Sequence, residues 1–224
     1  MNRALNHVDT WIFDLDNTLY PASASLFDLI DERMSAYLCR VMQCSPERAR
    51  TVQKGYFRDH GTTLAGMMAH HGTDPHHFLD FVHDVSLDRL SPDPELASAI
   101  DALPGRKLVF TNGDERYAAR VLAARGLDGI FDGIFDIHRA QYRPKPDART
   151  YHRLCRELDI RPARSLFAED MARNLIPAKQ LGMTTLWIDN GSELGNHDAH
   201  DDSIDYVAGD IADWLMLQRE DAGA

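Results

Sequence analysis

Polar side chains that could do chemistry follow three short apolar runs of this chain: Asp14 and Asp16, Thr111 and Asn112, and Glu169 and Asp170. Bulky apolar runs of this length are typical of strands buried in a parallel sheet. The carboxyl ends of parallel strands meet at one edge, where open α/β sheets bind ligands. We therefore expect these six residues to converge, although the sequence places the first and the last far apart.

The carboxylates among them favour phosphate chemistry with a divalent cation. Asp14, Asp16 and Asp170 offer the hard oxygen ligands that suit Mg²⁺. A metal among carboxylates favours a substrate with negative oxygens of its own, and phosphate fits. A carboxylate beside a bound metal stays ionised and can attack phosphorus, while a second carboxyl two residues away can protonate the leaving oxygen and then activate water.

Two further groups could hold the substrate. The Thr111 hydroxyl, Asn112 and backbone N–H groups at a helix start can bind phosphate oxygens. Lys145 is fixed between Pro144 and Pro146, so its ammonium can neutralise charge that develops during reaction.

Each of these patterns also has an ordinary structural interpretation. The aspartate pair and Thr111-Asn112-Gly113 could be turns after strands, and Lys145 could be a solvated lysine. Glu169-Asp170 could merely open a helix, where acidic groups offset the dipole. The combination of all four patterns, in order, favours a catalytic site.

Alternating strand and helix signals predict an α/β fold with a doubly wound parallel sheet. Besides the three runs above, strands are expected near residues 133–136, 185–188 and 206–207. Helices are expected over residues 117–125, 146–158 and 175–181, with Pro146 opening the second and Pro177 confined to the first turn of the third.

The stretch from Leu26 to about Val85 has no strand signal but four helical patterns. An all-helical block after the first strand is best explained as an inserted cap, with Ser91-Pro92-Asp93-Pro94 as its return hinge. We expect an α/β catalytic core over residues 1–20 and 90–224 and a helical cap over residues 21–89.

Four segments carry a resemblance to a known family: Asp14-Leu15-Asp16-Asn17-Thr18-Leu19, Thr111-Asn112, Lys145-Pro146 and Glu169-Asp170. Their order resembles the four motifs of the haloacid-dehalogenase-like hydrolase superfamily, whose members include enzymes with a helical cap between the first two motifs. The resemblance covers nearly the whole chain.

The resemblance implies roles residue by residue. Asp14 matches the nucleophile and a Mg²⁺ ligand, and Asp16 matches the acid/base that also offers its backbone carbonyl to the metal. Thr111 and Lys145 match phosphate holders, with Asn112 contacting phosphate through side chain or backbone. Asp170 matches the third protein ligand of the metal, and Glu169 is a further candidate where the family often has Asp.

A narrower likeness concerns the substrate. Asp16 to Pro21, Tyr56 to Leu64 in the cap, and Asn174 to Lys179 resemble the pyrimidine 5′-nucleotidase branch. This implies a Mg²⁺-dependent phosphomonoesterase that acts through an aspartyl-phosphate on a nucleoside 5′-monophosphate. The alternatives are a phosphatase of another small phosphorylated metabolite, a sugar phosphomutase, and a non-catalytic binding or regulatory protein of this fold.

Charge and composition restrict which kinds of partner the protein can have. The chain has 224 residues and a net charge of −11, and its acidic surface disfavours nucleic-acid binding. No apolar run approaches the length of a membrane span, and three cysteines are too few for a disulfide framework. We expect a cytoplasmic protein with a small phosphorylated ligand, and no nucleic acid or membrane partner.

Overall fold

A six-stranded parallel sheet forms the centre of the molecule. The structure is a computed structural model, and it describes residues 5–191, 195 and 201–220. The strands are β1 (Thr10–Phe13), β2 (Arg106–Phe110), β3 (Gly133–Phe135), β4 (Ser165–Glu169), β5 (Thr184–Ile188) and β6 (Tyr206–Ala208). Their order in the sheet is β3-β2-β1-β4-β5-β6, so the chain changes direction across the sheet between β1 and β4. This confirms the predicted doubly wound fold.

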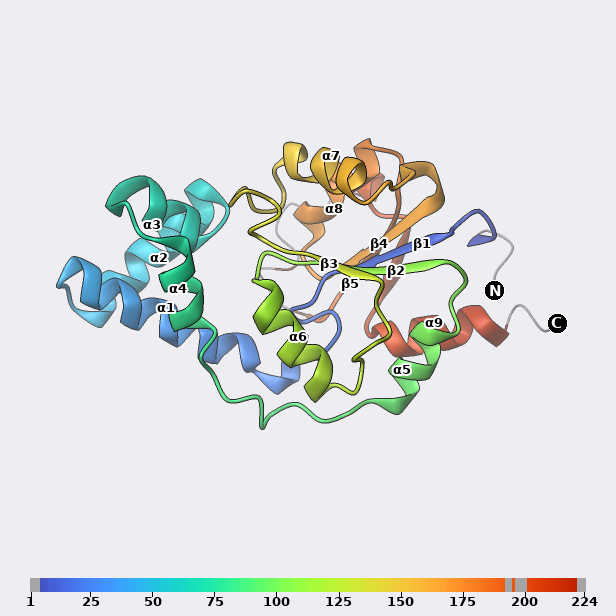
Figure 1. The fold of residues 1–224 in the computed structure, drawn as a ribbon, viewed down its shortest axis with the longest axis horizontal. Coiled ribbons are helices and arrows are strands. Elements are labelled where there is room, and N and C mark those ends of the chain that lie inside the picture. Colours follow the sequence, from blue (N-terminus) through green and yellow to red (C-terminus); the bar gives the residue numbers. More distant parts are fainter. Residues whose placement is uncertain (1–4, 192–194, 196–200, 221–224) are drawn as a thin grey trace.

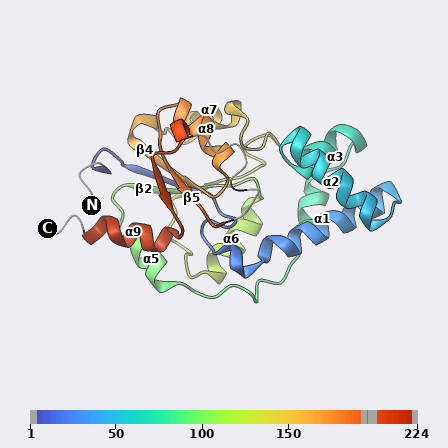
Figure 2. The same cartoon turned by 180° about the vertical axis from the view of Figure 1, so that it is seen from behind.

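Helices cover both faces of the sheet (Figures 1 and 2). One face carries α7 (Ala148–Glu157) and α8 (Ala172–Gln180), and the other carries α5 (Pro94–Asp101), α6 (Glu115–Ala124) and α9 (Ile211–Glu220). The central strands are buried because both faces are covered; every residue of β1 and β4 is buried. Short 3-10 turns lie at Ala22–Ala24, Pro162–Arg164 and Asp201–Ser203.

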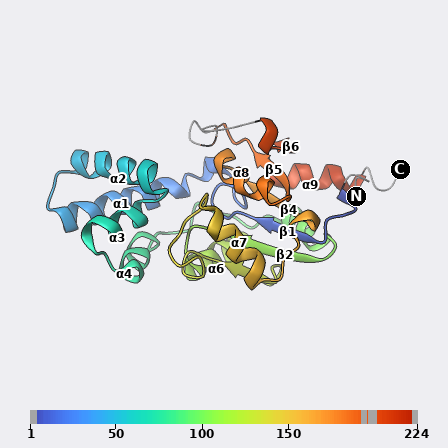
Figure 3. The same ribbon diagram turned by 90° about the horizontal axis from the view of Figure 1, so that it is seen from above.

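Four helices between β1 and α5 form a separate block, which we call the helical cap: α1 (Leu26–Met42), α2 (Pro46–His60), α3 (Thr63–His71) and α4 (Pro75–Val82). Figures 1 and 3 show it at one end of the molecule, beyond the carboxyl end of β1. Side-chain oxygens of Ser45, Thr62 and Asp74 accept backbone N–H bonds at the starts of α2, α3 and α4. These caps satisfy backbone donors that would otherwise lack partners.

Several helix boundaries differ from the sequence prediction. Helix α8 begins at Ala172, so Pro177 lies inside it rather than in its first turn, and the helix lacks the backbone N–H donor at that position. Helix α7 begins at Ala148, because Asp147 caps it by accepting from Arg149 N, and Pro146 precedes the cap. At the end of the expected hinge, residues 91–94, Pro94 begins α5 and Asp93 caps it.

Two further observations concern the chain as a whole. Cys39, Cys44 and Cys155 are all free thiols. Within residues 5–191 and 201–220, no helix combines the length and the apolar character that a membrane crossing requires.

Candidate active site

Three buried carboxylates meet where β1 and β4 end. Asp14 continues the pairing of the two strands, since its backbone N–H donates to Ala168 O at 2.9 Å. This register places Asp14 beside Glu169 and Asp170, and carboxylate oxygens of all three residues lie within 4.8 Å of one another. The site therefore lies at the strand switch point, where doubly wound sheets bind ligands.

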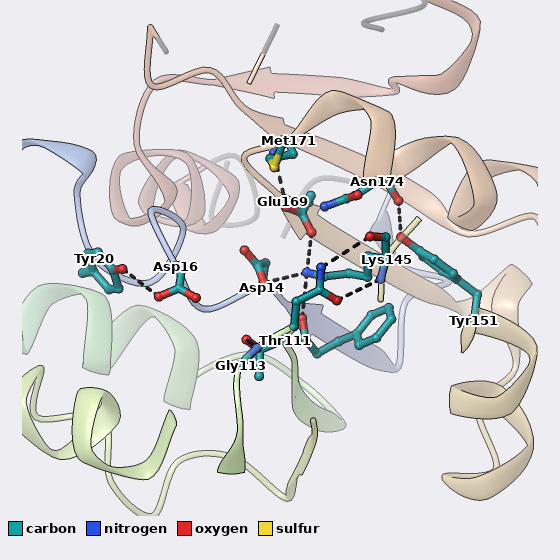
Figure 4. Close-up of polar contacts among 12 residues, drawn as sticks. Asp14, Asp16, Tyr20, Thr111, Gly113, Lys145, Tyr151, Glu169, Met171 and Asn174 are labelled. Atoms are coloured by element: carbon teal, nitrogen blue, oxygen red, sulfur yellow. Dashed lines mark hydrogen bonds and ion pairs between the residues drawn. The ribbon is translucent and has the colours of Figure 1, made fainter. Parts of the chain in front are cut away.

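Lys145 joins two of these carboxylates (Figure 4). Its side chain is 2% exposed, and Nζ donates to Asp14 Oδ1 at 2.6 Å and to Glu169 Oε2 at 2.6 Å. The third donation goes to the carbonyl of Phe110 at 3.0 Å. All three ammonium hydrogens thus have partners, which fixes the charge beside Asp14.

Asn112 holds the backbone of Lys145 in place. Its Oδ1 accepts from Lys145 N at 2.8 Å, and its Nδ2 donates to Lys145 O at 3.4 Å. Both polar atoms of the Asn112 side chain therefore bind the loop of residues 143–146, which we call the lysine loop. The backbone N–H of Asn112 is then the group of this residue that could contact phosphate.

The electrostatics of the three carboxylates are unfavourable without a further cation. Burial, followed by the negative charge of Glu169, raises the pKa of Asp14 to about 8, against the opposing charge of Lys145. Burial and the charges of Glu169 and Asp14 also hold the pKa of Asp170 well above its usual value. Burial alone would lower the pKa of Lys145, but the two carboxylates it contacts raise it overall.

This donor set fits a divalent cation. Three carboxylates against one ammonium leave an excess of negative charge in a buried space, and oxygen donors are what Mg²⁺ prefers. Glu169 already uses Oε2 for Lys145 and Oε1 for Met171 N, at 3.2 Å. Asp170 Oδ2 accepts a hydrogen bond from the side-chain amide of Asn190 at 3.2 Å.

Thr111 lies at the end of β2, next to Lys145 (Figure 4). It is 1% exposed, and its Oγ1 accepts from Gly113 N at 2.9 Å. The bond shapes a tight turn between β2 and α6, so the hydroxyl stands beside backbone N–H groups at a helix start.

Asp16 stands apart from the other acidic residues. Its Oδ1 accepts from two tyrosine hydroxyls, Tyr20 at 2.7 Å and Tyr117 at 2.8 Å. Burial and the charge of Asp16 raise the pKa of both phenols well above the usual value, so both remain donors. The sequence alone does not identify either tyrosine as part of the site: Tyr117 is predicted only as a helix residue, and Tyr20 belongs only to the stretch from Asp16 to Pro21.

The end of α2 reaches the core beside the site. A Cβ at Gly61 would lie 3.2 Å from Pro144 Cγ, next to the lysine loop. The Arg173 guanidinium, in the first turn of α8, lies 4.4 Å from the centre of the Phe57 ring. The cap stretch 56–64 therefore lies against the lysine loop and against the first turn of α8, which follows Glu169 and Asp170.

The chain is thus a doubly wound α/β protein with a buried acidic cluster at the strand switch point and a helical cap. A family model for haloacid dehalogenase-like hydrolases matches residues 8–182. The chain belongs to the haloacid dehalogenase-like hydrolases.

The sequence identity to individual proteins is low. The chain is 25% identical over 189 residues to phosphate metabolism protein 8 of Saccharomyces cerevisiae, a match covering 77% of this chain and 59% of the yeast protein. The matched stretch thus spans less than two thirds of that relative.

Solved structures of the family share the fold. A phosphatase of this family from Thermococcus onnurineus has a TM-score of 0.61 at 18% identity, covering 96% of this chain and 98% of the other. L-2-haloacid dehalogenase from Xanthobacter autotrophicus has a TM-score of 0.57 at 17% identity, covering 95% and 98%. Phosphatases and dehalogenases thus use the same architecture, so the reaction must be argued from the site.

Proposed function

We propose that this hydrolase is a Mg²⁺-dependent phosphomonoesterase that works through an aspartyl-phosphate at Asp14. The observation that carries the proposal is the buried cluster of Asp14, Glu169 and Asp170, in which one lysine binds both Asp14 and Glu169. Such a cluster suits a divalent cation and an anionic substrate. A carboxyl two residues after the nucleophile, at Asp16, further favours phosphoryl transfer, which needs an acid/base.

Each residue then has a role in two displacements. An Asp14 oxygen forms a bond to phosphorus as the bond from phosphorus to the leaving oxygen breaks, and Asp16 gives that oxygen its proton. Asp16 next takes a proton from water, whose oxygen attacks phosphorus and releases phosphate from Asp14. Lys145 exchanges one of its three hydrogen bonds for a bond to a phosphate oxygen, the Thr111 hydroxyl binds another phosphate oxygen, and Asn112 keeps the lysine loop in position.

Asp14, Asp170 and the backbone carbonyl of Asp16 are the proposed metal ligands, with Glu169 as a neighbour that orients Lys145. The bound ion would neutralise charge on the phosphoryl oxygens and lower the pKa of the carboxylates around it. This assignment explains why three acidic side chains are buried together.

The proposed substrate is a nucleoside 5′-monophosphate, with pyrimidines favoured. Support comes from the likeness of the first motif, the cap stretch 56–64 and residues 174–179 to the pyrimidine 5′-nucleotidases. We assign residues 21–89 to a cap that selects the leaving group and residues 1–20 and 90–224 to the catalytic core. Free thiols at all three cysteines suit the cytoplasm as the place of action.

Phosphate release from a panel of phosphomonoesters tests the proposal. The panel contains pyrimidine and purine nucleoside monophosphates, sugar phosphates and p-nitrophenyl phosphate, each with Mg²⁺ and with EDTA. We expect Mg²⁺-dependent release, fastest for pyrimidine nucleotides. Isomerised sugar phosphate without free phosphate would identify a mutase, chloride release from 2-chloropropionate a dehalogenase, and no turnover of any compound a binding protein.

A further inference from the structure

We propose that Tyr20 and Tyr117 are positioning residues that hold the carboxylate of Asp16 in the orientation required for proton transfer. The inference rests on the proposed function, because it assumes that Asp16 is the acid/base. Neither tyrosine need touch the substrate; both act through Asp16.

The geometry around Asp16 carries the inference. Both hydroxyls donate to the same oxygen, Oδ1, at 2.7 Å from Tyr20 and 2.8 Å from Tyr117. Both tyrosine side chains belong to residues that are only 1% exposed. The described residues donate no hydrogen bond to the other oxygen, Oδ2. Figure 4 shows Tyr20 on the side of Asp16 that faces away from Asp14.

Two donors on one oxygen restrict how the carboxylate can turn. An aspartate at the end of a strand has several staggered rotamers, and only a subset places an oxygen within reach of the leaving group. Proton transfer requires a heavy-atom distance of about 2.6–3.2 Å. Fixing Oδ1 leaves Oδ2 available for the proton in both displacements, without the entropy loss of ordering the side chain each time.

Tyr117 is itself held from three sides. Its backbone N–H donates to Asp114 Oδ1 at 2.8 Å, and its ring stacks on His83 at a centroid distance of 4.3 Å and an angle of 13°. Asp114 Oδ2 also contacts His83 Nδ1 at 2.6 Å. A Cβ on Gly113 would lie 3.2 Å from the ring, so the turn is packed closely against it. The phenol therefore has little freedom to leave Asp16.

The two tyrosines also connect Asp16 to both chain segments that link cap and core. Tyr20 lies on the segment that leaves β1 for α1, and His83 lies directly after α4, on the returning segment. The carboxylate is thus anchored where the cap joins the sheet, rather than by residues of the acidic cluster.

Tyr20→Phe and Tyr117→Phe, alone and combined, test the inference, because each removes one hydroxyl and keeps the ring. Tyr151→Phe is the matched control: Tyr151 is 0% exposed and its hydroxyl donates to Asn174 O at 2.6 Å, without contact to Asp16. Each variant is assayed with p-nitrophenyl phosphate and with the alkyl phosphate that the wild type hydrolyses fastest. Melting temperature and circular dichroism report folding.

We expect each single variant to lose about tenfold in kcat on the alkyl phosphate, and the double variant about a hundredfold, which approaches the loss in Asp16→Asn. KM should change by less than about threefold, and p-nitrophenyl phosphate should lose less because its leaving group needs little protonation. Added to Asp16→Asn, the tyrosine substitutions should cause no further loss, since they act through the carboxyl that is already gone. Tyr151→Phe should leave the ratio of the two substrates unchanged.

Several results would overturn the inference. The tyrosines would have another role if their substitution lowered kcat as much in the Asp16→Asn protein as in wild type. The same conclusion would follow if the tyrosine variants lost equal activity on both substrates, or if Tyr151→Phe changed the ratio of the two activities. If Asp16→Asn spares the alkyl phosphate, the acid role in the proposed function fails and the inference with it. If Asp16→Asn shows the loss but neither tyrosine variant does, only the inference fails. Either single variant suffices if the other does not fold.

Discussion

Lys145 is the residue on which the burial of Asp14 and Glu169 depends. Its ammonium donates to both carboxylates at 2.6 Å, and the side chain is 2% exposed. Removing one member of a buried ion pair leaves an uncompensated charge, which typically costs about 3–5 kcal/mol.

Lys145→Met should therefore lower the free energy of unfolding by about 3–5 kcal/mol in metal-free protein, and should abolish turnover. Urea denaturation with EDTA measures the first effect and phosphate release the second. Lys179→Met is the control. Lys179 pairs with Asp205, but the side chain of Lys179 is 36% exposed and that of Asp205 31% exposed, and such a pair contributes about 1 kcal/mol or less. Equal losses in the two variants would contradict the special role of Lys145.

Asp14→Asn separates the nucleophile from the scaffold. The amide keeps an oxygen that can accept from Lys145, so the fold should survive, while turnover should fall by several orders of magnitude. Stopped-flow turnover and mass spectrometry of acid-quenched protein measure the outcome: wild type should gain one phosphoryl group and the variant none. A phosphorylated Asp14→Asn protein would place the covalent bond elsewhere.

The sequence could predict which residues converge but not how each one is bonded. Asp14, Glu169 and Asp170 were predictable as neighbours because they follow strands, and parallel strand ends share one edge. The contact of Tyr117 with Asp16 was not, because it depends on how a ring in α6 packs against His83 and Gly113. The use of the Asn112 amide for the lysine loop was likewise invisible in the sequence.

At the scale of elements, two glycines near the end of α2 have opposite requirements. Gly61 has φ of +84°, and a Cβ there would lie 3.2 Å from Pro144 Cγ, whereas a Cβ at Gly55, inside α2, would meet nothing within 4 Å. Gly61→Ala should lose about 1–3 kcal/mol of stability through backbone strain and reduce kcat/KM by displacing the lysine loop. Gly55→Ala should gain about 0.5–1 kcal/mol with unchanged kcat/KM.

Thermal unfolding and steady-state kinetics of the two glycine variants provide the measurement. Gly55→Ala controls for the effect of adding a methyl group to α2. A Gly61→Ala protein as stable and as active as wild type would show that the junction of α2 and α3 tolerates a side chain.

Asp205 links α8 to β5 and gives this part of the sheet a pH dependence. Burial raises the pKa of Asp205, but hydrogen bonds from Lys179 and from the backbone and hydroxyl of Thr185 outweigh it, so the pKa is lowered overall. A carboxyl with a lowered pKa in the folded state adds stability above its unfolded pKa of about 3.9 and loses it as pH falls through the folded value.

Asp205→Asn should therefore be less stable than wild type at pH 7, and the difference should shrink below about pH 4. Urea denaturation of both proteins from pH 7 to pH 3 measures it. A stability difference that stays constant across this range would mean that the ionised carboxylate contributes nothing.

Element boundaries show where local sequence signals stop being informative. Asp74-Pro75 and Asp93-Pro94 are the same dipeptide, and in the structure both open a helix through an aspartate cap. Only the second lies in a proline-rich stretch, Ser91-Pro92-Asp93-Pro94, and for that reason the sequence suggests a hinge there rather than a helix start. The helix predicted over residues 117–125 stops before Gly126, and in the structure α6 does end there, at Ala124. Gly126 has a φ of +69°, which glycine adopts readily.

At the scale of the whole molecule, the proposed function assigns the choice of substrate to the cap rather than to the core. Under that proposal, the core groups near Asp14 contact the phosphoryl group, which all phosphomonoesters share. Discrimination must come from residues that reach the leaving group, and stretch 56–64 of the cap contacts the core at Pro144 and Arg173.

Within this stretch, Phe57 is a better probe than Thr62 or His60. The Thr62 hydroxyl accepts from Ala65 N at 3.1 Å and caps α3, so its substitution would disturb the helix itself. His60 Nε2 lies 3.0 Å from His70 Nε2, a contact within the cap. Phe57 is half-buried, and its ring faces the core residue Arg173 at 4.4 Å.

Phe57→Leu should reduce kcat/KM for the preferred nucleotide by about tenfold more than for p-nitrophenyl phosphate, because it loosens the contact of cap and core around the leaving group. Phe81→Leu is the matched control: Phe81 is also half-buried, and its ring lies 4.3 Å from Arg33 and 4.7 Å from Arg40, both within the cap. It should lower stability while leaving the ratio of the two substrates as in wild type. Parallel losses on both substrates in Phe57→Leu, or the same change of ratio in Phe81→Leu, would mean that the cap contributes general stability rather than selection of the leaving group.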